Sequence, residues 1–414
     1  MSIKQFVRVI EVLVAAAIVM LGMSAAAIAK EPIRIGVIAP WSWPDGKDFY
    51  RGAEIAAAQI NASGGILGRK LKLYSYDSHA SATQAVSAFQ RAVKQDHVVA
   101  MVGGFVDRDN VAMQPWAGRL KTPFIEVAGF GSHLYRDEHK NYNLYKYTFQ
   151  EYTTSNFMAR SACDFAKDVL VDKFHFKTAV TLVEQSPWSL QVNQEYQKCL
   201  PKAGLKILHN IVMPLGTKDF TPIISEIRKY NPDVAMTGIA AIGATLISQL
   251  HQAEVPVLLA GPDAQGSSPG FWEATNGAAQ GLIVGGRISV NGAPVSKLTP
   301  AFYKAFVKRF GKAPPFSGYT TYDAIYTLRN AIVRAGTTDA GKLVTAIEKT
   351  HRTGVTGPIS FYSRHQRFAH CRKFVPRRTS GVYTQWQNGK QVVVWPKRLA
   401  TGNVILPKYM QASR

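Results

Sequence analysis

The sequence is short of cysteine and of acidic residues, and both shortages exclude classes of protein. Its 414 residues include three cysteines, Cys163, Cys199 and Cys371, none of them in C-x-x-C spacing, so a zinc or dithiol redox site has no support. The 27 acidic residues stand against 49 lysines and arginines, a formal net charge of +22. Neither a tandem repeat nor a low-complexity tract is visible, which excludes solenoids and largely disordered chains.

Long apolar runs are absent except at the N-terminus. There Lys4 and Arg8 precede the apolar run 12–23, and Ala27-Ile28-Ala29 fits a small-x-small cleavage site. Residues 12–29 form an uncharged stretch of 18 residues, close to membrane-spanning length, so an uncleaved anchor is the alternative. We favour a signal peptide cleaved near Ala29, which predicts an exported, periplasmic protein.

The basic charge could suit nucleic acid. In an exported protein we interpret it as a solvated basic surface and expect no nucleic-acid partner.

Strand and helix patterns alternate from residue 31 onward, which is typical of parallel βαβ units. The rhythm pauses in a polar, tyrosine-rich stretch, His133–Tyr152, and then restarts. A length of 414 residues favours two domains. Asn388-Gly389 predicts a hairpin between two short C-terminal strands. The sequence therefore predicts an α/β protein with two doubly wound parallel sheets.

Two glycine-containing segments could suggest catalysis or nucleotide binding. The stretch 61–68 lacks the Gly-Lys-Ser/Thr ending of a phosphate loop and follows a helix, so we interpret it as a turn. Residues 266–270 match G-x-S-x-G, but Ser268 is separated from the preceding strand and Pro269 follows it. A nucleophile elbow needs a strand directly before the serine and a helix directly after it, so we expect no enzyme.

Several ordered motifs resemble those of a known family. Gly52-Ala53-Glu54 followed by 60–71 (INASGGILGRKL), then Gly261-Pro262-Asp263, 319–324 (YTTYDA) and 357–361 (GPISF) are similar to the signatures of branched-chain amino-acid-type periplasmic binding proteins. The resemblance spans about residues 31–395. It implies a type I periplasmic-binding fold, with a small ligand held between two lobes.

The same resemblance implies lobes that are discontinuous in sequence. The first lobe would comprise residues 30–148 with 288–355, and the second 149–287 with 356–414. Three crossing segments would lie near 144–149, 282–290 and 356–361. Such linkers suit hinge closure over a ligand at the carboxyl ends of the strands.

Cys163 and Cys199 both lie on helices assigned to the second lobe, so they are the expected disulfide pair.

In the first lobe, the family's ligand-carboxylate positions fall on altered residues. A hydroxyl position falls on Asp107, and a second set falls on Ala128 and Phe130, with Gly129 between them. A carboxylate at Asp107 would repel a ligand carboxylate unless it were protonated or neutralised by Arg108. The alternative is that Asp107 caps a helix starting near Asp109.

In the second lobe, Trp188 falls where the family has an aromatic lid, and Asp263 where a carboxylate takes the ligand's amine. Trp43, or its neighbour Trp41, lies in the loop after the first strand, which also faces the implied cleft. Turn formation by Asp263 and interlobe packing by the tryptophans are the alternatives. Aromatic faces and carboxylates both attract cations, so this set suits an amine, amide or aromatic solute.

Three functions remain open from the sequence. The favoured one is a monomeric solute-binding protein that uses no cofactor or metal and delivers its ligand to a membrane ABC permease. A ligand-sensing subunit that signals to a receptor without transport is the alternative. An exported hydrolase using Ser268 is the weakest.

Overall fold

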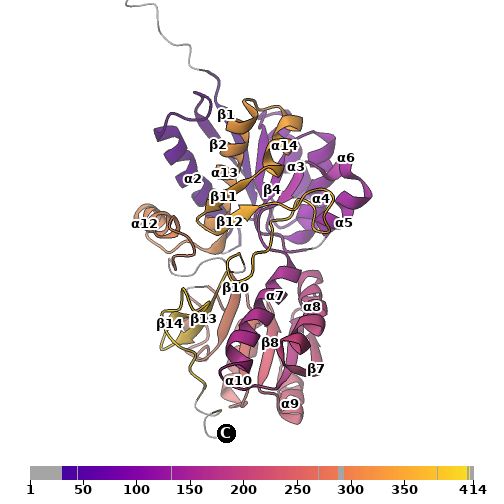
Figure 1. Ribbon diagram of the computed structural model, residues 1–414, viewed down its shortest axis with the longest axis vertical. Helices are drawn as coiled ribbons and strands as arrows, with labels where there is room; N and C mark the ends of the chain where they lie inside the picture. The colour runs from indigo at the N-terminus through magenta and orange to yellow at the C-terminus, as the bar shows by residue number, and fades with distance from the viewer. Residues whose placement is uncertain are drawn as a thin grey trace, which may run out of the picture.

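The structure, a computed structural model, describes residues 30–43, 45–131, 133–268, 270–287, 293–379, 381–407 and 410. Helices and strands gather into two lobes, one above the other in Figure 1, each built on its own sheet. The expected signal peptide, residues 1–29, lies outside the described residues. Within the described ranges, no helix has both the length and the apolar character needed to cross a membrane.

The first lobe holds a five-stranded sheet covered by helices. Its elements are β1 (Ile33–Ala39), α2 (Gly46–Ala62), β2 (Leu71–Asp77), α3 (Ala82–Lys94), β3 (Ala100–Gly103), α4 (Asp107–Arg119), β4 (Phe124–Glu126), α5 (His133–Lys140), α6 (Tyr142–Tyr145), β5 (Thr148–Gln150), α12 (Thr299–Phe310), α13 (Phe316–Ala335), α14 (Ala340–Glu348), β11 (His351–Gly354) and β12 (Gly357–Ser360). The sheet order is β2-β1-β3-β4-β5, with every neighbouring pair parallel. β11 and β12 form a separate antiparallel pair within this lobe, toward the side that faces the second lobe (Figure 1).

The second lobe holds a seven-stranded sheet. Its elements are α7 (Ser155–Phe165), the π-helix η1 (Ala166–Val171), β6 (Thr178–Glu184), α8 (Pro187–Ala203), β7 (Lys206–Met213), α9 (Thr221–Tyr230), β8 (Val234–Gly238), α10 (Gly243–Gln252), β9 (Leu258–Pro262), α11 (Phe271–Ala274), β10 (Ile283–Arg287), β13 (Val382–Gln387) and β14 (Lys390–Trp395). The order is β14-β13-β10-β9-β8-β6-β7. The β10–β13 and β13–β14 pairs are antiparallel, and the other neighbouring pairs are parallel.

Local sequence signals explain where these elements begin and end. β1 and β8 are buried apolar runs, as strands covered on both faces must be. Pro187 occupies the first turn of α8, and Gly204 ends that helix in the left-handed conformation. Asn388 and Gly389 have φ of 49° and 78°, which confirms the predicted hairpin between β13 and β14. The predicted α/β class with two doubly wound sheets is also confirmed, with the β13–β14 hairpin as an antiparallel edge.

Three segments carry the chain between the lobes, and each lies later in the sequence than the resemblance implies. The first crossing segment, residues 151–154, follows β5. The second lies between β10 and α12, and the third, residues 373–379, precedes β13. Residues 144–149, expected to cross, instead form the end of α6, a two-residue turn and the first two residues of β5. β5 is short and lies in the polar, tyrosine-rich stretch His133–Tyr152, so no long apolar run marks it in the sequence.

The first and third crossing segments are paired where they leave the first lobe. The Gln150 N–H donates to the His370 carbonyl at 3.0 Å, and the Arg372 N–H donates to the Gln150 carbonyl at 2.8 Å. The Arg372 side chain is buried and donates to the Thr356 carbonyl at 2.8 Å. Residues 356–372, assigned to the second lobe from the resemblance, therefore lie against the first sheet in the structure.

Cys163 in α7 and Cys199 in α8 form a disulfide, with their Cα atoms 5.9 Å apart. The expected pairing is confirmed. Cys371 keeps a buried thiol, which donates to Gln150 Oε1 at 3.2 Å.

Candidate functional site

Polar and aromatic residues gather where parallel strands end, the usual position of ligands in open α/β sheets. In the first lobe these residues follow β1, β3 and β4. In the second lobe they follow β6, β8 and β9. The two groups meet where the lobes adjoin, because Phe130 of the first lobe packs against Trp188 of the second, with ring centroids 6.3 Å apart.

Asp107 is the first residue of α4 and reaches across to the loop after β4. Its Oδ1 accepts hydrogen bonds from the backbone N–H of Phe130 at 2.9 Å and of Gly131 at 3.2 Å. The N-cap of α4 is Val106, without a side-chain cap, so Asp107 does not fill the capping role considered from the sequence. Backbone donors of the kind that hold anions are thus occupied by the protein's own carboxylate.

Beneath Asp107 lies a layer of buried polar side chains. Glu126 Oε1 accepts from Gln114 Nε2 at 2.6 Å, while Glu126 Oε2 and both polar atoms of Asn110 are buried with no hydrogen-bond partner among the described residues. The pKa of Glu126 is raised to about 8, mainly by burial; the Gln114 hydrogen bond opposes the shift and the charge of Asp107 adds to it. A Cβ on Gly129 would lie 2.3 Å from Asn110 Nδ2, so a larger residue at 129 would force the Asn110 side chain to move.

Six aromatic rings extend from the first lobe to the second, and we call them the aromatic array. They are Trp43, Phe105, Phe316, Phe130, Tyr152 and Trp188. Successive centroids lie 5.1 Å apart for Trp43–Phe105, 5.9 Å for Phe105–Phe316, 6.4 Å for Phe316–Phe130 and 5.1 Å for Phe130–Tyr152. Rings at these separations interact favourably and present faces that attract apolar groups and cations.

The loop after β1 brings Trp43 to one end of the array. Gly46 is packed so tightly against Pro40 that a Cβ there would lie 1.8 Å from the Pro40 carbonyl oxygen. Trp43 is 41% exposed and Trp41 38% exposed. Trp43 packs edge-on against Phe105, whereas Trp41 is tied down through its backbone N–H, which donates to Asp77 Oδ1 at 3.1 Å. Of the two tryptophans considered from the sequence, Trp43 belongs to the array.

In the second lobe a buried glutamate missed by the sequence analysis fills another set of backbone donors. Glu184, at the end of β6, accepts through Oε1 from the N–H groups of Ala240, Ala241 and Ile242 at 2.9, 2.5 and 3.0 Å. These residues lead into the N-terminus of α10, a position suited to anions. The sequence marks Glu184 only as an acidic residue at the end of an apolar strand. Each lobe thus fills converging backbone donors with an internal carboxylate.

Asp263 lies at the end of β9 with 2% exposure. Its Oδ1 accepts from the Gly266 N–H at 2.8 Å, and the carboxylate fits closely against Gly243, where a Cβ would lie 3.0 Å from Oδ1. These contacts fit the alternative considered from the sequence, in which Asp263 stabilises a turn, better than a role in binding the ligand's amine.

Two further predicted ligand-binding positions, Arg108 and Ala128, also make contacts within the protein. The Arg108 guanidinium pairs with the carboxylate of Asp109 at 3.4 Å and donates to the Ala80 carbonyl. Its ion pair is thus with Asp109 and does not neutralise Asp107. Ala128 is fully buried and contributes only backbone to the loop that ends at Phe130.

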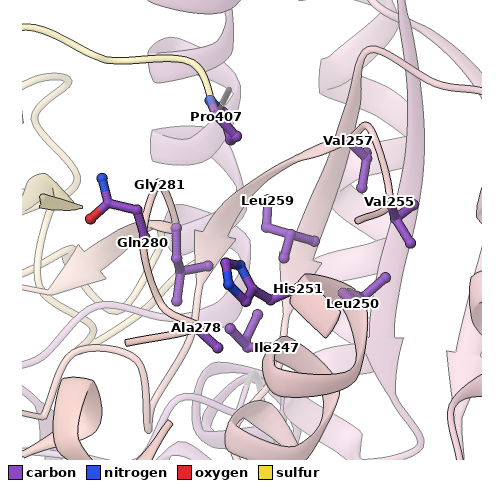
Figure 2. Close-up of a pocket in the computed structure, with 11 residues that line it drawn as sticks. Ile247, Leu250, His251, Val255, Val257, Leu259, Ala278, Gln280, Gly281 and Pro407 are labelled. Carbon is purple, nitrogen blue, oxygen red and sulfur yellow. The ribbon is translucent and has the colours of Figure 1, made fainter. Parts of the chain in front are cut away.

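Other candidate chemistry finds little support in the described residues. Ser268 lies in a turn, with its N–H donating to the Gln265 carbonyl at 2.9 Å, and no strand runs into it. In the part of the chain that the structure describes, no group of three or more His, Cys, Asp or Glu could hold a metal. A pocket in the second lobe, between α10, β9 and Pro407 (Figure 2), holds about 20 Å³, room for about one water molecule.

Two parallel α/β sheets joined by three crossing segments define a type I periplasmic-binding fold. The chain belongs to the periplasmic binding protein family, whose model matches residues 32–380. Family membership implies an extracytoplasmic location and the capture of small solutes in the manner of ABC-transporter binding proteins.

Known proteins are similar over most of the chain. A Brucella abortus protein named Leu/Ile/Val-binding protein homolog 7 is 23% identical over 406 residues, covering 92% of this chain and 96% of that protein. A Silicibacter pomeroyi structure assigned to a branched-chain amino acid ABC transporter has a TM-score of 0.81 at 19% identity, covering 92% of this chain and all of that one. A Rhodopseudomonas palustris solute-binding protein in complex with 3,4-dihydroxybenzoic acid has a TM-score of 0.70 at 19% identity, covering 87% and 95%.

Proposed function

We propose that this protein captures a small solute carrying an aromatic ring and an amine between its two lobes, and delivers it to an ABC permease in the membrane. The observation that carries the proposal is the occupation of the Phe130 and Gly131 N–H groups by Asp107, inside an aromatic array that spans both lobes. Family membership supports the transport role.

The chemistry of the array favours a cation over an anion. Asp107 brings a negative charge next to the ring of Phe130, and a carboxylate and ring faces both stabilise a bound amine. A ligand carboxylate would meet Asp107 instead of free backbone donors, and in the second lobe Glu184 already occupies the donors before α10. Binding of a solute with only an anionic end is therefore disfavoured.

The proposed ligand contacts are Trp43, Asp107, Phe130 and Trp188, with the backbone of 128–130 forming the floor. Arg108 and Asp263 are held by Asp109 and Gly266, so we do not include them. Trp188 comes from the second lobe, and hinge closure about the crossing segments would bring it over a ligand resting on the first lobe.

A matched series of ligands tests this proposal. Phenethylamine, phenylalanine and 3-phenylpropanoate share one ring and differ only in their amine and carboxylate. We expect calorimetry to rank them in that order, with phenethylamine at least about tenfold tighter than 3-phenylpropanoate. Tighter binding of phenylpropanoate would overturn the ligand class. Saturable binding of a solute by a variant that lacks the rings of Trp43 and Trp188 would overturn the site.

A further inference from the structure

A second cavity, of about 470 Å³, lies among the segments that connect the lobes. It is lined by residues 295–298 before α12, by Thr353 of β11, by Gly357 and Pro358 of β12, by Arg378 of the third crossing segment, and by Arg398 after β14. Its volume falls in the range of small-molecule sites. Residues from the first lobe, the second lobe and two crossing segments therefore share one concave surface.

The charged side chains that line this cavity are all cationic. Lys297, Arg378 and Arg398 line it, and none of the other lining residues is acidic. Within the described ranges, the side chains of Lys297 and Arg378 make no ion pair, and Arg398 only donates to the Arg377 carbonyl at 3.2 Å. Burial lowers the pKa of Arg398, and the charge of Arg378 lowers it further, so the two guanidinium groups are close enough to repel one another.

The neighbouring arginine shows that charge pairing is available nearby. Arg377 forms two hydrogen bonds with the Asp168 carboxylate, at 2.8 and 2.7 Å. Arg378, one residue further along, pairs with no acid within the described residues. Converging guanidinium groups without acidic partners are what the recognition of phosphate-type anions requires, because each planar fork can donate two hydrogen bonds to one anion.

We propose that this cavity binds a small dianionic oxyanion, phosphate or a close analogue, between Lys297, Arg378 and Arg398. An anion there would neutralise the repulsion between the arginines. It would also link Arg398 of the second lobe to residues 295–298, which return the chain to the first lobe. The proposal is independent of the ligand assigned to the aromatic array, since it uses none of the same residues.

Calorimetric titration with inorganic phosphate, in chloride buffer at constant ionic strength, tests this site. We expect one saturable site per chain. The double variant Arg378→Gln with Arg398→Gln should weaken phosphate binding at least about tenfold. The matched control, Lys202→Gln with Lys206→Gln, removes the same charge from exposed positions of the second lobe and should leave the affinity within about twofold.

Two results would overturn the proposal. One is the absence of saturable phosphate binding to the wild type. The other is an equal loss in both double variants, which would reveal a general effect of the basic surface. Circular dichroism checks folding. If the arginine double variant unfolds, Arg378→Gln alone carries the test, because that side chain makes no hydrogen bond among the described residues. It should then weaken binding at least about threefold.

Discussion

Asp107 Oδ1 lies 2.9 Å from the backbone nitrogen of Phe130 and accepts its hydrogen bond. The side chain of one residue thus stands where a bound anion could otherwise use a main-chain donor. Asp107 stands where the resembling family has a hydroxyl residue, and this hydrogen bond links that difference to the kind of solute that the first lobe can hold.

Replacing Asp107 should change the ligand preference. Asp107→Ser removes the internal acceptor and leaves the Phe130 and Gly131 N–H groups for a ligand carboxylate. The affinity for phenylalanine relative to phenethylamine should rise at least about tenfold by calorimetry. Asp107→Asn is the matched control, because it keeps an acceptor oxygen and removes the charge. It should weaken phenethylamine without improving phenylalanine, and an unchanged preference in Asp107→Ser would contradict the proposal.

Truncating either end of the aromatic array should weaken ligand binding with little loss of stability. Trp188→Ala and Trp43→Ala should each weaken phenethylamine at least about tenfold, because aromatic anchors dominate small binding sites. Trp43 is 41% exposed, so its removal leaves only a shallow defect. Trp41→Ala is the control from the same loop and should bind normally. Equal losses at positions 41 and 43 would point to a general loop effect.

The buried glutamates predict a loss of stability as the pH rises. Burial raises the pKa of Glu126 and of Glu151 to about 8 each, from an ordinary value of 4.5. A carboxyl whose pKa is higher in the folded state binds its proton more tightly there. Its contribution is therefore complete below about pH 4.5 and is lost as the pH rises through about 8. Urea unfolding of the ligand-free protein at several pH values measures this effect.

Glu126→Gln tests the origin of that pH dependence, since glutamine keeps the size of the side chain and cannot ionise. Its stability should fall less steeply than that of the wild type between about pH 5 and about pH 8. Glu31→Gln removes a carboxyl that is 79% exposed and should keep the wild-type slope. A Glu126→Gln slope equal to that of the wild type would contradict the burial argument.

The disulfide between α7 and α8 should stabilise the second lobe. It closes a loop with a sequence separation of 36 residues, for which chain entropy gives a contribution of roughly 3–4 kcal/mol. Replacing both Cys163 and Cys199 by serine should lower the urea midpoint accordingly. Cys371→Ser is the control at a buried cysteine outside the disulfide, and it should cost less. An unchanged midpoint in the double variant would contradict this chain-entropy argument.

Much of the fold could be predicted from the sequence, because long apolar strands and amphipathic helices carry their own periodicity. The hairpin between β13 and β14 was predicted at Asn388-Gly389, where the structure has it. The elements that escaped are short or polar, such as β5, whose three residues include buried Thr148 and Gln150. Their burial depends on neighbouring strands and leaves no local pattern.

The sequence predicted several residues of the candidate site but not the contacts that their side chains make. The family resemblance pointed to Asp107, Phe130 and Trp188, but the direction in which a side chain turns depends on helices distant in sequence. Phe316 enters the array from α13, and Glu184 turns toward the loop before α10. Neither contact leaves a trace in the spacing of the sequence.

The hydrogen bonds that join Gln150 to His370 and Arg372 have a mechanical consequence. The first and third crossing segments leave the first lobe side by side, because these main-chain hydrogen bonds join the residues directly before them. We expect this pairing to hold the two segments at a fixed spacing where they start, so that they bend together. Hinge motion about this pair would bring the rings of the two lobes together in a similar register each time.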